Sequence, residues 1–277
     1  MTDDPSRGDD LLAHVPEGPV PGSQHGDRLL DLVRVMSRLR GPGGCPWDAE
    51  QTHRTLARHL LEETHELLEA IDAGDDDAMR DELGDVLLQV VFHAQIAADE
   101  GRWDVDDVAE GLVRKLVYRH PHVFGEVEVA GADEVLVNWE RLKAAEAGER
   151  AAVDDAIPAS LPSLARAAKV QRRAAGWGFE WRSVDTAVEA LREEVDELAA
   201  AMGDPEHAEE EVGDVLFAAV ALARKLGVDA ESALRRTVRA FSERYERFVR
   251  LAEERGIDVE TADEGELRTL FREARAR

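Results

Sequence analysis

The chain has 277 residues, of which 60 are acidic and 34 are basic, so its formal net charge is −26. This charge argues against a nucleic-acid-binding protein and against binding to an anionic membrane surface, because phosphate-bearing partners need a basic face. Hydrophobic residues make up 44% of the chain, which is enough for a folded core. The single cysteine, Cys45, excludes an internal disulfide, and we interpret it as structural. No apolar run approaches the roughly 20 residues of a membrane span, and the acidic N-terminus is unlike a secretory signal, so we expect a cytoplasmic protein.

The first part of the chain is predicted to be a flexible tail over residues 1–26 and a helical repeat over residues 27–125. Within the repeat, apolar residues recur at helical spacing, and glycine and proline mark the breaks between helices. The predicted helices run from Asp27 to about 40, from about Thr52 to Gly74, from just after Asp75 to about Gly101, and from about Asp104 to Arg119. Residues 41–46 are predicted to be a loop, and only the run 123–129 could be extended. His120 and His122 could be read as metal ligands, but Pro121 and Phe124 beside them favour a packed turn.

The same order of elements returns after a predicted linker over residues 126–160, which contains a short helical piece around 139–143. A Gly- and Trp-containing loop over 176–182 again separates the first two helices of this second repeat, residues 161–254. Its helices are predicted over 161–175, 183–202, 205–226 and 230–254. Residues 255–277 are predicted to be a C-terminal tail helix. No alternating strand pattern of useful length occurs, so the sequence predicts an all-α protein with two helical bundles.

Two acidic motifs occur in the same order in both repeats. E-E-x-x-E at 62–66 has a counterpart at 193–197, and D-E-L-G-D at 81–85 returns as E-E-V-G-D at 210–214. Residues three apart on a helix share a face, so antiparallel packing of the two helices would bring four carboxylates together. Four acids alone would arise by chance in so acidic a chain, whereas the repeated motif with its internal glycine would not. Apolar residues of the type found in cores are interspersed among these acids, which predicts that the acids lie beside a buried seam. These apolar residues are Leu60, Leu67, Leu83 and Val86.

Carboxylates crowded at such a seam repel each other and raise one another's pKa unless a cation neutralises them. Ligation by oxygen alone suits Mg²⁺, or Mn²⁺, which take the rest of their ligand shell from water and substrate phosphates. A metal would also explain how so negative a protein binds an anionic nucleotide. A di-iron site is the first alternative, because Glu62-x-x-His65 resembles half of a ferritin-like ligand set, although Asp196 replaces the histidine in the second repeat. A non-catalytic acidic helical adaptor with solvated carboxylates is the second.

From about Leu29 to Phe271 the chain resembles the two-repeat MazG-type nucleoside triphosphate pyrophosphohydrolases. The resemblance implies an all-α NTP pyrophosphohydrolase fold of two tandem four-helix modules, Mg²⁺ dependence and homodimerisation. It also implies hydrolysis of NTPs or dNTPs to the monophosphate and pyrophosphate, as housekeeping of the nucleotide pool. The motifs that carry it, besides the two acidic motifs of each repeat, are G-G-C-P-W-D-x-E-Q-T-H (43–53), R-H-P-H-V-F-G (119–125), W-E-x-x-K (139–143) and G-F-E-W (178–181).

The resemblance further implies roles for individual residues. Glu62 or Glu193 would take the proton of the water that attacks the α-phosphorus. The implied metal ligands are Glu63, Glu66, Glu82, Asp85, Glu194, Glu197, Glu211 and Asp214. Cations that would hold the leaving pyrophosphate are Lys115, Arg119, Arg239 and Arg244. The base would stack on Trp47 or Trp181, with Phe271 as a lid.

The second repeat departs from the family at one place. Its last helix usually carries Lys-Phe-x-x-Arg, but Ala240 stands in the lysine position, next to Arg239. Because the first repeat has at least as complete a residue set, both repeats are predicted to be active sites with equal weight. The base and sugar stay open at this point, since a broad NTP hydrolase, a dUTP- or damaged-nucleotide-selective enzyme and a phosphoribosyl-ATP pyrophosphohydrolase would share these carboxylates.

Overall fold

The computed structural model describes residues 9–16, 26–131, 135, 138–139, 142, 153–154 and 157–275. The chain divides into two compact units, Met1–Arg150 and Ala151–Arg277. Regular structure in the described ranges is entirely helical, without any strand, which confirms the predicted all-α class. None of the helices in these ranges is long and apolar enough to cross a membrane.

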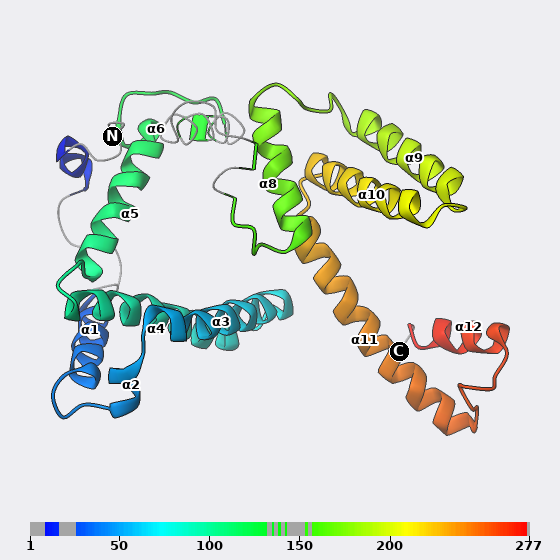
Figure 1. Cartoon of the computed structure of the whole chain (residues 1–277), viewed down its shortest axis with the longest axis horizontal. Coiled ribbons are helices and arrows are strands. Elements are labelled where there is room, and N and C mark those ends of the chain that lie inside the picture. Colours follow the sequence, from blue (N-terminus) through cyan, green and yellow to red (C-terminus); the bar gives the residue numbers. More distant parts are fainter. Residues whose placement is uncertain are drawn as a thin grey trace. The chain divides into compact units, whose positions relative to one another are not determined.

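The first unit is built on a helical hairpin, in which α3 (His53–Ala73) packs against α4 (Asp76–Asp99). Helix α1 (Asp27–Arg40) packs on α4, and α5 (Val105–Arg119) follows from the end of α4 (Figure 1). The core forms where α1, α3 and α4 meet, and each of its central side chains is at most 3% exposed. These side chains are Met36, Leu56, Val91, Phe92 and Ile96.

Local signals set the ends of the two hairpin helices. The hydroxyl of Thr52 accepts a hydrogen bond from the N–H of Thr55, which caps the start of α3. At the other end Gly74 has a φ of 68°, a left-handed conformation that glycine adopts without steric cost. Asp75 then caps α4 by accepting from the backbone N–H groups of Asp77 and Ala78 at 3.1 Å. This tight turn makes α3 and α4 antiparallel, so their acidic motifs lie opposite each other.

The second unit contains a matching hairpin of α9 (Val184–Ala201) and α10 (Pro205–Lys225). Helix α8 (Ser163–Gly176) packs against α10 and against the long α11 (Ala230–Arg255). Helix α12 (Glu264–Glu273) folds back beside α11 (Figure 1). The main apolar cluster of this unit joins α11 to α12 and their flanks. It contains Phe248, Leu251, Ala252, Leu270 and Ala274.

Short elements differ from the sequence-based prediction. Helix α2 (Pro46–Glu50) lies between the predicted loop and α3, and Arg40 holds it by donating to the carbonyl of Asp48. Helix α6 (Pro121–Phe124) shows that an extended conformation for residues 123 and 124 is wrong. A 3₁₀ helix, η2 (Asp9–His14), packs against α5 inside the predicted tail. These pieces are too short for apolar periodicity to show them. Apart from residues 139 and 142, the helical piece predicted around 139–143 lies outside the described residues.

Candidate active site

The α3–α4 hairpin brings three predicted ligands together. Glu63 and Glu66 lie one turn apart on α3, and Glu82 faces them from α4. Each offers one carboxylate oxygen, and these three oxygens lie within 4.8 Å of one another. We call this group the first cluster. Three negative charges at this spacing repel each other unless protons or a cation reduce their charge.

The surroundings of the first cluster raise the pKa of two of its carboxyls, those of Glu63 and Glu82. Partial burial is the largest cause that raises the pKa of Glu63, and the charge of Asp85 is the second, ahead of Glu66 and Glu82. Partial burial, followed by the charges of Glu66, Asp85 and Asp81, also raises the pKa of Glu82. Asp85 is outside the tight group, but its charge acts on both glutamates. The crowded negative charge of the first cluster would attract a positive ion.

The α9–α10 hairpin carries an equivalent group, the second cluster. Oxygens of Glu194, Glu197 and Glu211 again lie within 4.8 Å of one another. Partial burial raises the pKa of Glu194, and the charge of Asp214 is the next largest cause, followed by Glu197 and Glu211. In each repeat, then, three of the four predicted ligands converge, and the charge of the fourth, an aspartate, raises the pKa of at least one of them.

Glu211 gives a direct test of whether a metal fits. Its side chain is buried, with the residue only 8% exposed. The Nε2–H of His207 donates to its Oε1 at 2.9 Å, whereas its Oε2 is buried without a hydrogen-bond partner in the described part of the chain. A buried carboxylate oxygen without a partner is costly, and a bound cation would offset that cost. The donors are all carboxylate oxygens, so Mg²⁺ or Mn²⁺ fits both clusters.

The predicted buried seam beside the acids is wrong in part. Leu83, next to Glu82, is 50% exposed, and Leu60 on α3 is 38% exposed, although Leu67 and Val86 are partly buried. The reason is that α1 covers the hairpin on the side of Leu56 and Phe92, where the core lies. The first cluster therefore lies on an open face of the hairpin, with exposed apolar residues around it.

The predicted general bases and stacking aromatics lie outside the clusters. Glu62 is exposed, and its Oε2 lies 3.2 Å from Nδ1 of His59. The ring of Trp47 meets the ring of His59 edge-on, with 6.2 Å between centroids, so the tryptophan lies near α3 one turn before Glu63. In the second unit Glu193 is exposed and adds its charge to those that raise the pKa of Glu194.

Trp181 is 42% exposed in the loop before α9. Glu180 fixes this loop to the end of α10, because its carboxylate pairs with Arg224 at 2.8 Å and with Lys225 at 3.4 Å.

The predicted cations of the first unit are not brought to the cluster within one chain. Lys115 and Arg119 occupy the last turns of α5, and Figure 1 shows the end of α5 running away from the α3–α4 hairpin. The guanidinium of Arg119 lies over the ring of Trp139, 5.4 Å from its centroid. The structure thus gives Arg119 an aromatic partner in the same chain.

The predicted cations of the second unit have neighbours on α11 and α12. Arg239 lies 4.0 Å from the carboxylate of Glu243. Arg244 donates to the backbone carbonyl of Phe271 at 2.8 Å, and its guanidinium lies 3.8 Å from the centre of the Phe271 ring. Phe271 also packs against Phe241 and Phe248. Arg244 and Phe271 therefore join α12 to α11 in this structure.

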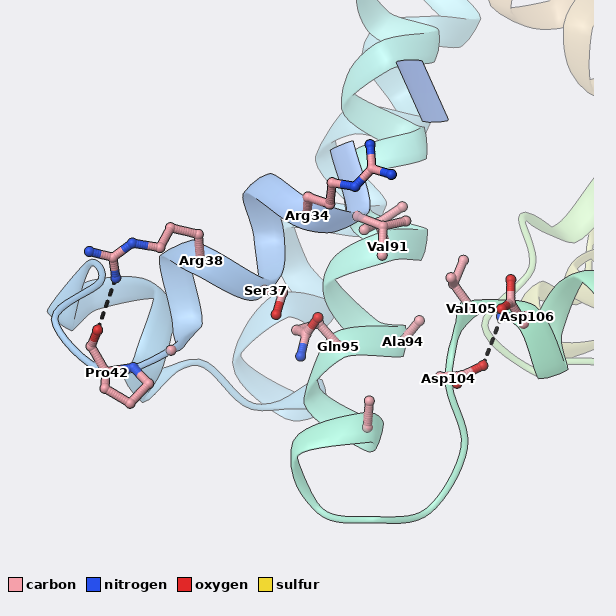
Figure 2. Close-up of a pocket in the computed structure, with 13 residues that line it drawn as sticks. Arg34, Ser37, Arg38, Pro42, Val91, Ala94, Gln95, Asp104, Val105 and Asp106 are labelled. Carbon is pink, nitrogen blue, oxygen red and sulfur yellow. Dashed lines mark hydrogen bonds between the residues drawn. The ribbon is translucent and has the colours of Figure 1, made fainter. Parts of the chain in front are cut away.

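A groove of about 730 Å³ lies in the first unit between α1, the second half of α4 and the start of α5, and no cluster glutamate lines it. Figure 2 shows Arg34 and Arg38 pointing away from each other at its edge, with Arg38 donating to the carbonyl of Pro42 at 2.9 Å. Asp104, on the opposite wall, caps α5. Because its polar groups do not converge, the groove is a weaker candidate for phosphate chemistry than the clusters.

Comparison with known proteins places these hairpins in a family. The profile of the MazG nucleotide pyrophosphohydrolase domain matches residues 51–124 and again residues 182–249, together just over half of the chain. The chain belongs to the MazG nucleotide pyrophosphohydrolase family. Each MazG match contains both acidic motifs of its repeat, so the two carboxylate clusters lie inside the two family domains.

Individual relatives agree with the MazG assignment. The chain is 46% identical over 251 residues to the nucleoside triphosphate pyrophosphohydrolase of Escherichia coli (strain K12), covering 86% of this chain and 94% of that protein. It is 45% identical over 232 residues to the nucleoside triphosphate pyrophosphohydrolase/pyrophosphatase MazG of Thermotoga maritima, covering 83% and 89%. A Mycobacterium tuberculosis nucleoside triphosphate pyrophosphohydrolase is 47% identical over 156 residues, 56% of this chain and 47% of that protein. The MazG resemblance seen in the sequence is confirmed.

Three residues that contact a candidate site residue or fix its loop were not predicted from the sequence: His207, His59 and Glu180. His207 precedes Glu211 by four residues, a spacing visible in the sequence but too common on helices to stand out. His59 has the spacing of a one-turn neighbour of Glu62. Glu180 pairs with Arg224 and Lys225, which lie 44 and 45 positions later in the chain. The sequence contains no local signal for such a contact.

Proposed function

We propose that this protein hydrolyses nucleoside triphosphates to the nucleoside monophosphate and pyrophosphate, and so serves the nucleotide pool of the cytoplasm. The observation that carries the proposal is the same three-glutamate cluster on the same helical hairpin in both MazG matches. The E. coli and T. maritima relatives, both named nucleoside triphosphate pyrophosphohydrolases, support it. We keep residues 27–125 and 161–254 as the catalytic repeats, with 126–160 as linker.

Mg²⁺, or Mn²⁺, is the proposed cofactor of both clusters, held by their glutamates with Asp85 and Asp214 completing each set. When bound, the cation would neutralise part of the triphosphate charge and polarise its phosphoryl oxygens. The buried, unpaired Oε2 of Glu211 and the raised pKa values of Glu63 and Glu194 support this assignment.

The neighbouring residues suggest how the chain handles the rest of the reaction. Glu62 and Glu193 are exposed beside the clusters, so either can accept the proton of a water that attacks the α-phosphorus. Trp47 and Trp181, both about half exposed, present apolar rings for the base. Lys115, Arg119, Arg239 and Arg244 stay the proposed cations for the leaving pyrophosphate, and Phe271 stays the proposed lid. Within one chain, however, Lys115 and Arg119 lie away from the first cluster, and Arg244 binds the carbonyl of Phe271.

We also propose a homodimer. Apolar side chains next to the cluster glutamates are about half exposed in both units: Leu83 beside Glu82, Val195 beside Glu194, and Val212 beside Glu211. An open apolar face of this kind is typical of a protein–protein interface. A second copy is the proposed occupant, because the resemblance to the MazG family implies a homodimer. The net charge of −26 disfavours nucleic acid and anionic membranes as alternative partners.

The test is a panel of NTPs and dNTPs incubated with Mg²⁺, scored for monophosphate and pyrophosphate against orthophosphate. Pyrophosphate as the first product, lost on chelation of the metal, supports attack at the α-phosphorus; orthophosphate as the first product would refute it. Glu63→Gln and Glu194→Gln, made separately and together, assign the activity to the repeats. Equal residual activity in the two single variants supports two sites, and the exposed Glu209→Gln on α10 controls for loss of one charge.

A further inference from the structure

The two clusters differ at one position next to the metal ligands. His207 lies one helical turn before Glu211 on α10, and its Nε2 lies 2.9 Å from Oε1 of Glu211. Because a carboxylate only accepts hydrogen bonds, Nε2 must carry the hydrogen and donate it. Glu82 is the counterpart of Glu211 in the first repeat, and Ala78 occupies the position one turn before it. The first cluster therefore has no equivalent donor at this position.

Glu211, which has the histidine neighbour, is also more deeply buried than Glu82, which lacks one. Glu211 is buried, whereas Glu82 is only partly buried. Since one oxygen of Glu211 is fixed by His207, the other oxygen, Oε2, is held in one place, and it is the oxygen left without a partner. A carboxylate already fixed in this way loses less conformational freedom when it binds a cation.

A simple helix-stabilising pair does not explain His207. Histidine is the third residue of α10, near the positive end of the helix dipole, and the acid follows it toward the C-terminus. This order is the less favourable one for a charge pair on a helix, where the acid should precede the base. The contact is better explained by what it does to Glu211.

We propose that His207 is a positioning residue that fixes Glu211 so that its free oxygen faces the divalent cation, and that the second cluster therefore binds metal more tightly than the first. This inference rests on the proposed function, since it concerns the same metal sites. Hydrogen bonds to metal-binding side chains commonly change metal affinity by about 10- to 100-fold. The first cluster has Ala78 at the corresponding position and therefore lacks this hydrogen bond.

Binding of Mn²⁺ to the full chain, measured by electron paramagnetic resonance, tests the inference without an activity assay. In the Glu63→Gln background, binding reports mainly on the second cluster. There His207→Ala should weaken Mn²⁺ binding at least about tenfold, and His207→Gln, which keeps a donor at the same reach, should restore most of the affinity. In the Glu194→Gln background, Ala78→His should tighten binding to the first cluster. Melting in EDTA shows whether each variant is folded.

The outcomes separate the inference from the proposed function. An unchanged Mn²⁺ affinity in folded His207→Ala, or equal losses in the Ala and Gln variants, would overturn the positioning role. Absence of Mn²⁺ binding in the Glu63→Gln chain would overturn it as well, because the second cluster would then not be a metal site. If the affinities follow the expected order but the wild-type chain releases no pyrophosphate from any NTP, the positioning role stands and the proposed hydrolysis fails.

Discussion

Replacing one glutamate of a cluster should make the metal-free protein more stable. Oxygens of Glu194, Glu197 and Glu211 lie within 4.8 Å of one another. At that distance two unit charges repel by about 0.9 kcal/mol even with the dielectric constant of water. Glu194→Gln removes two such repulsions, so we expect about 1–2 kcal/mol of added stability after allowing the remaining side chains to relax. For a unit of this size, the melting temperature should rise by about 5 °C.

Scanning calorimetry in EDTA and in saturating Mg²⁺ measures both halves of this prediction. In Mg²⁺ the order of stabilities should reverse, because a ligand at 100 times its Kd stabilises the wild-type fold by about 2.7 kcal/mol and the variant has lost a ligand. Glu209→Gln is the matched control: it removes an exposed charge from α10 outside the cluster and should change little under either condition. A Glu194→Gln variant that melts below the wild type in EDTA, or equal stabilisation of both proteins by Mg²⁺, would refute repulsion within the empty cluster.

Three further outcomes are expected. In EDTA, the stability advantage of Glu63→Gln over the wild type should grow as pH rises above about 4.3, because burial and then the neighbouring acids raise the pKa of Glu63 in the folded state. Between the unfolded pKa and this raised pKa, the folded wild type binds more protons than the unfolded chain, so its stability falls as pH rises; a constant difference would contradict this. Burial, and then His53, whose Nδ1 lies 2.7 Å from that of His93, lower the pKa of His93 in the folded state. The wild type should therefore lose stability below about pH 6.5, where the unfolded chain binds the proton more readily, and His93→Gln should lose less in thermal melting. Arg244→Ala should speed proteolysis within α12, since Arg244 holds the carbonyl and ring of Phe271; unchanged cleavage with a raised KM would instead favour substrate binding.

The helices and their ends could be predicted because the signals are local. Asp75 caps α4 through N–H groups two and three residues away, and Gly74 closes α3 through its own φ. The convergence of the acids followed from the same information, since a tight turn between two amphipathic helices leaves one antiparallel arrangement. Helix α2 was missed because its support comes from Arg40, which donates to the carbonyl of Asp48 across the intervening loop.

The surroundings of the site could not be predicted in the same way. Helical periodicity shows which face of α3 is apolar but not whether another helix covers it, so Leu60 and Leu83 were expected beside a buried seam and are exposed. Similarly, the sequence around Arg244 does not show what its side chain contacts. In the structure it donates to the carbonyl of Phe271, 27 residues away. The exposure of the two leucines and the partner of Arg244 both depend on how separate helices pack. No fixed spacing in the sequence shows that packing.

Exposed apolar residues are the sequence neighbours of the crowded acids, so the proposed homodimer would link metal binding to association. If a second copy covers Leu83 and Val212, the carboxylates beside them lose water, and burial is already the largest cause that raises the pKa of Glu63 and Glu194. Covering that face without a cation would increase the cost of their charge, whereas a bound cation would remove most of it. Linkage is reciprocal, so a metal that favours the dimer must bind the dimer more tightly than the monomer by the same factor. In the proposed homodimer, charge repulsion within the empty clusters would thus make association depend on the metal.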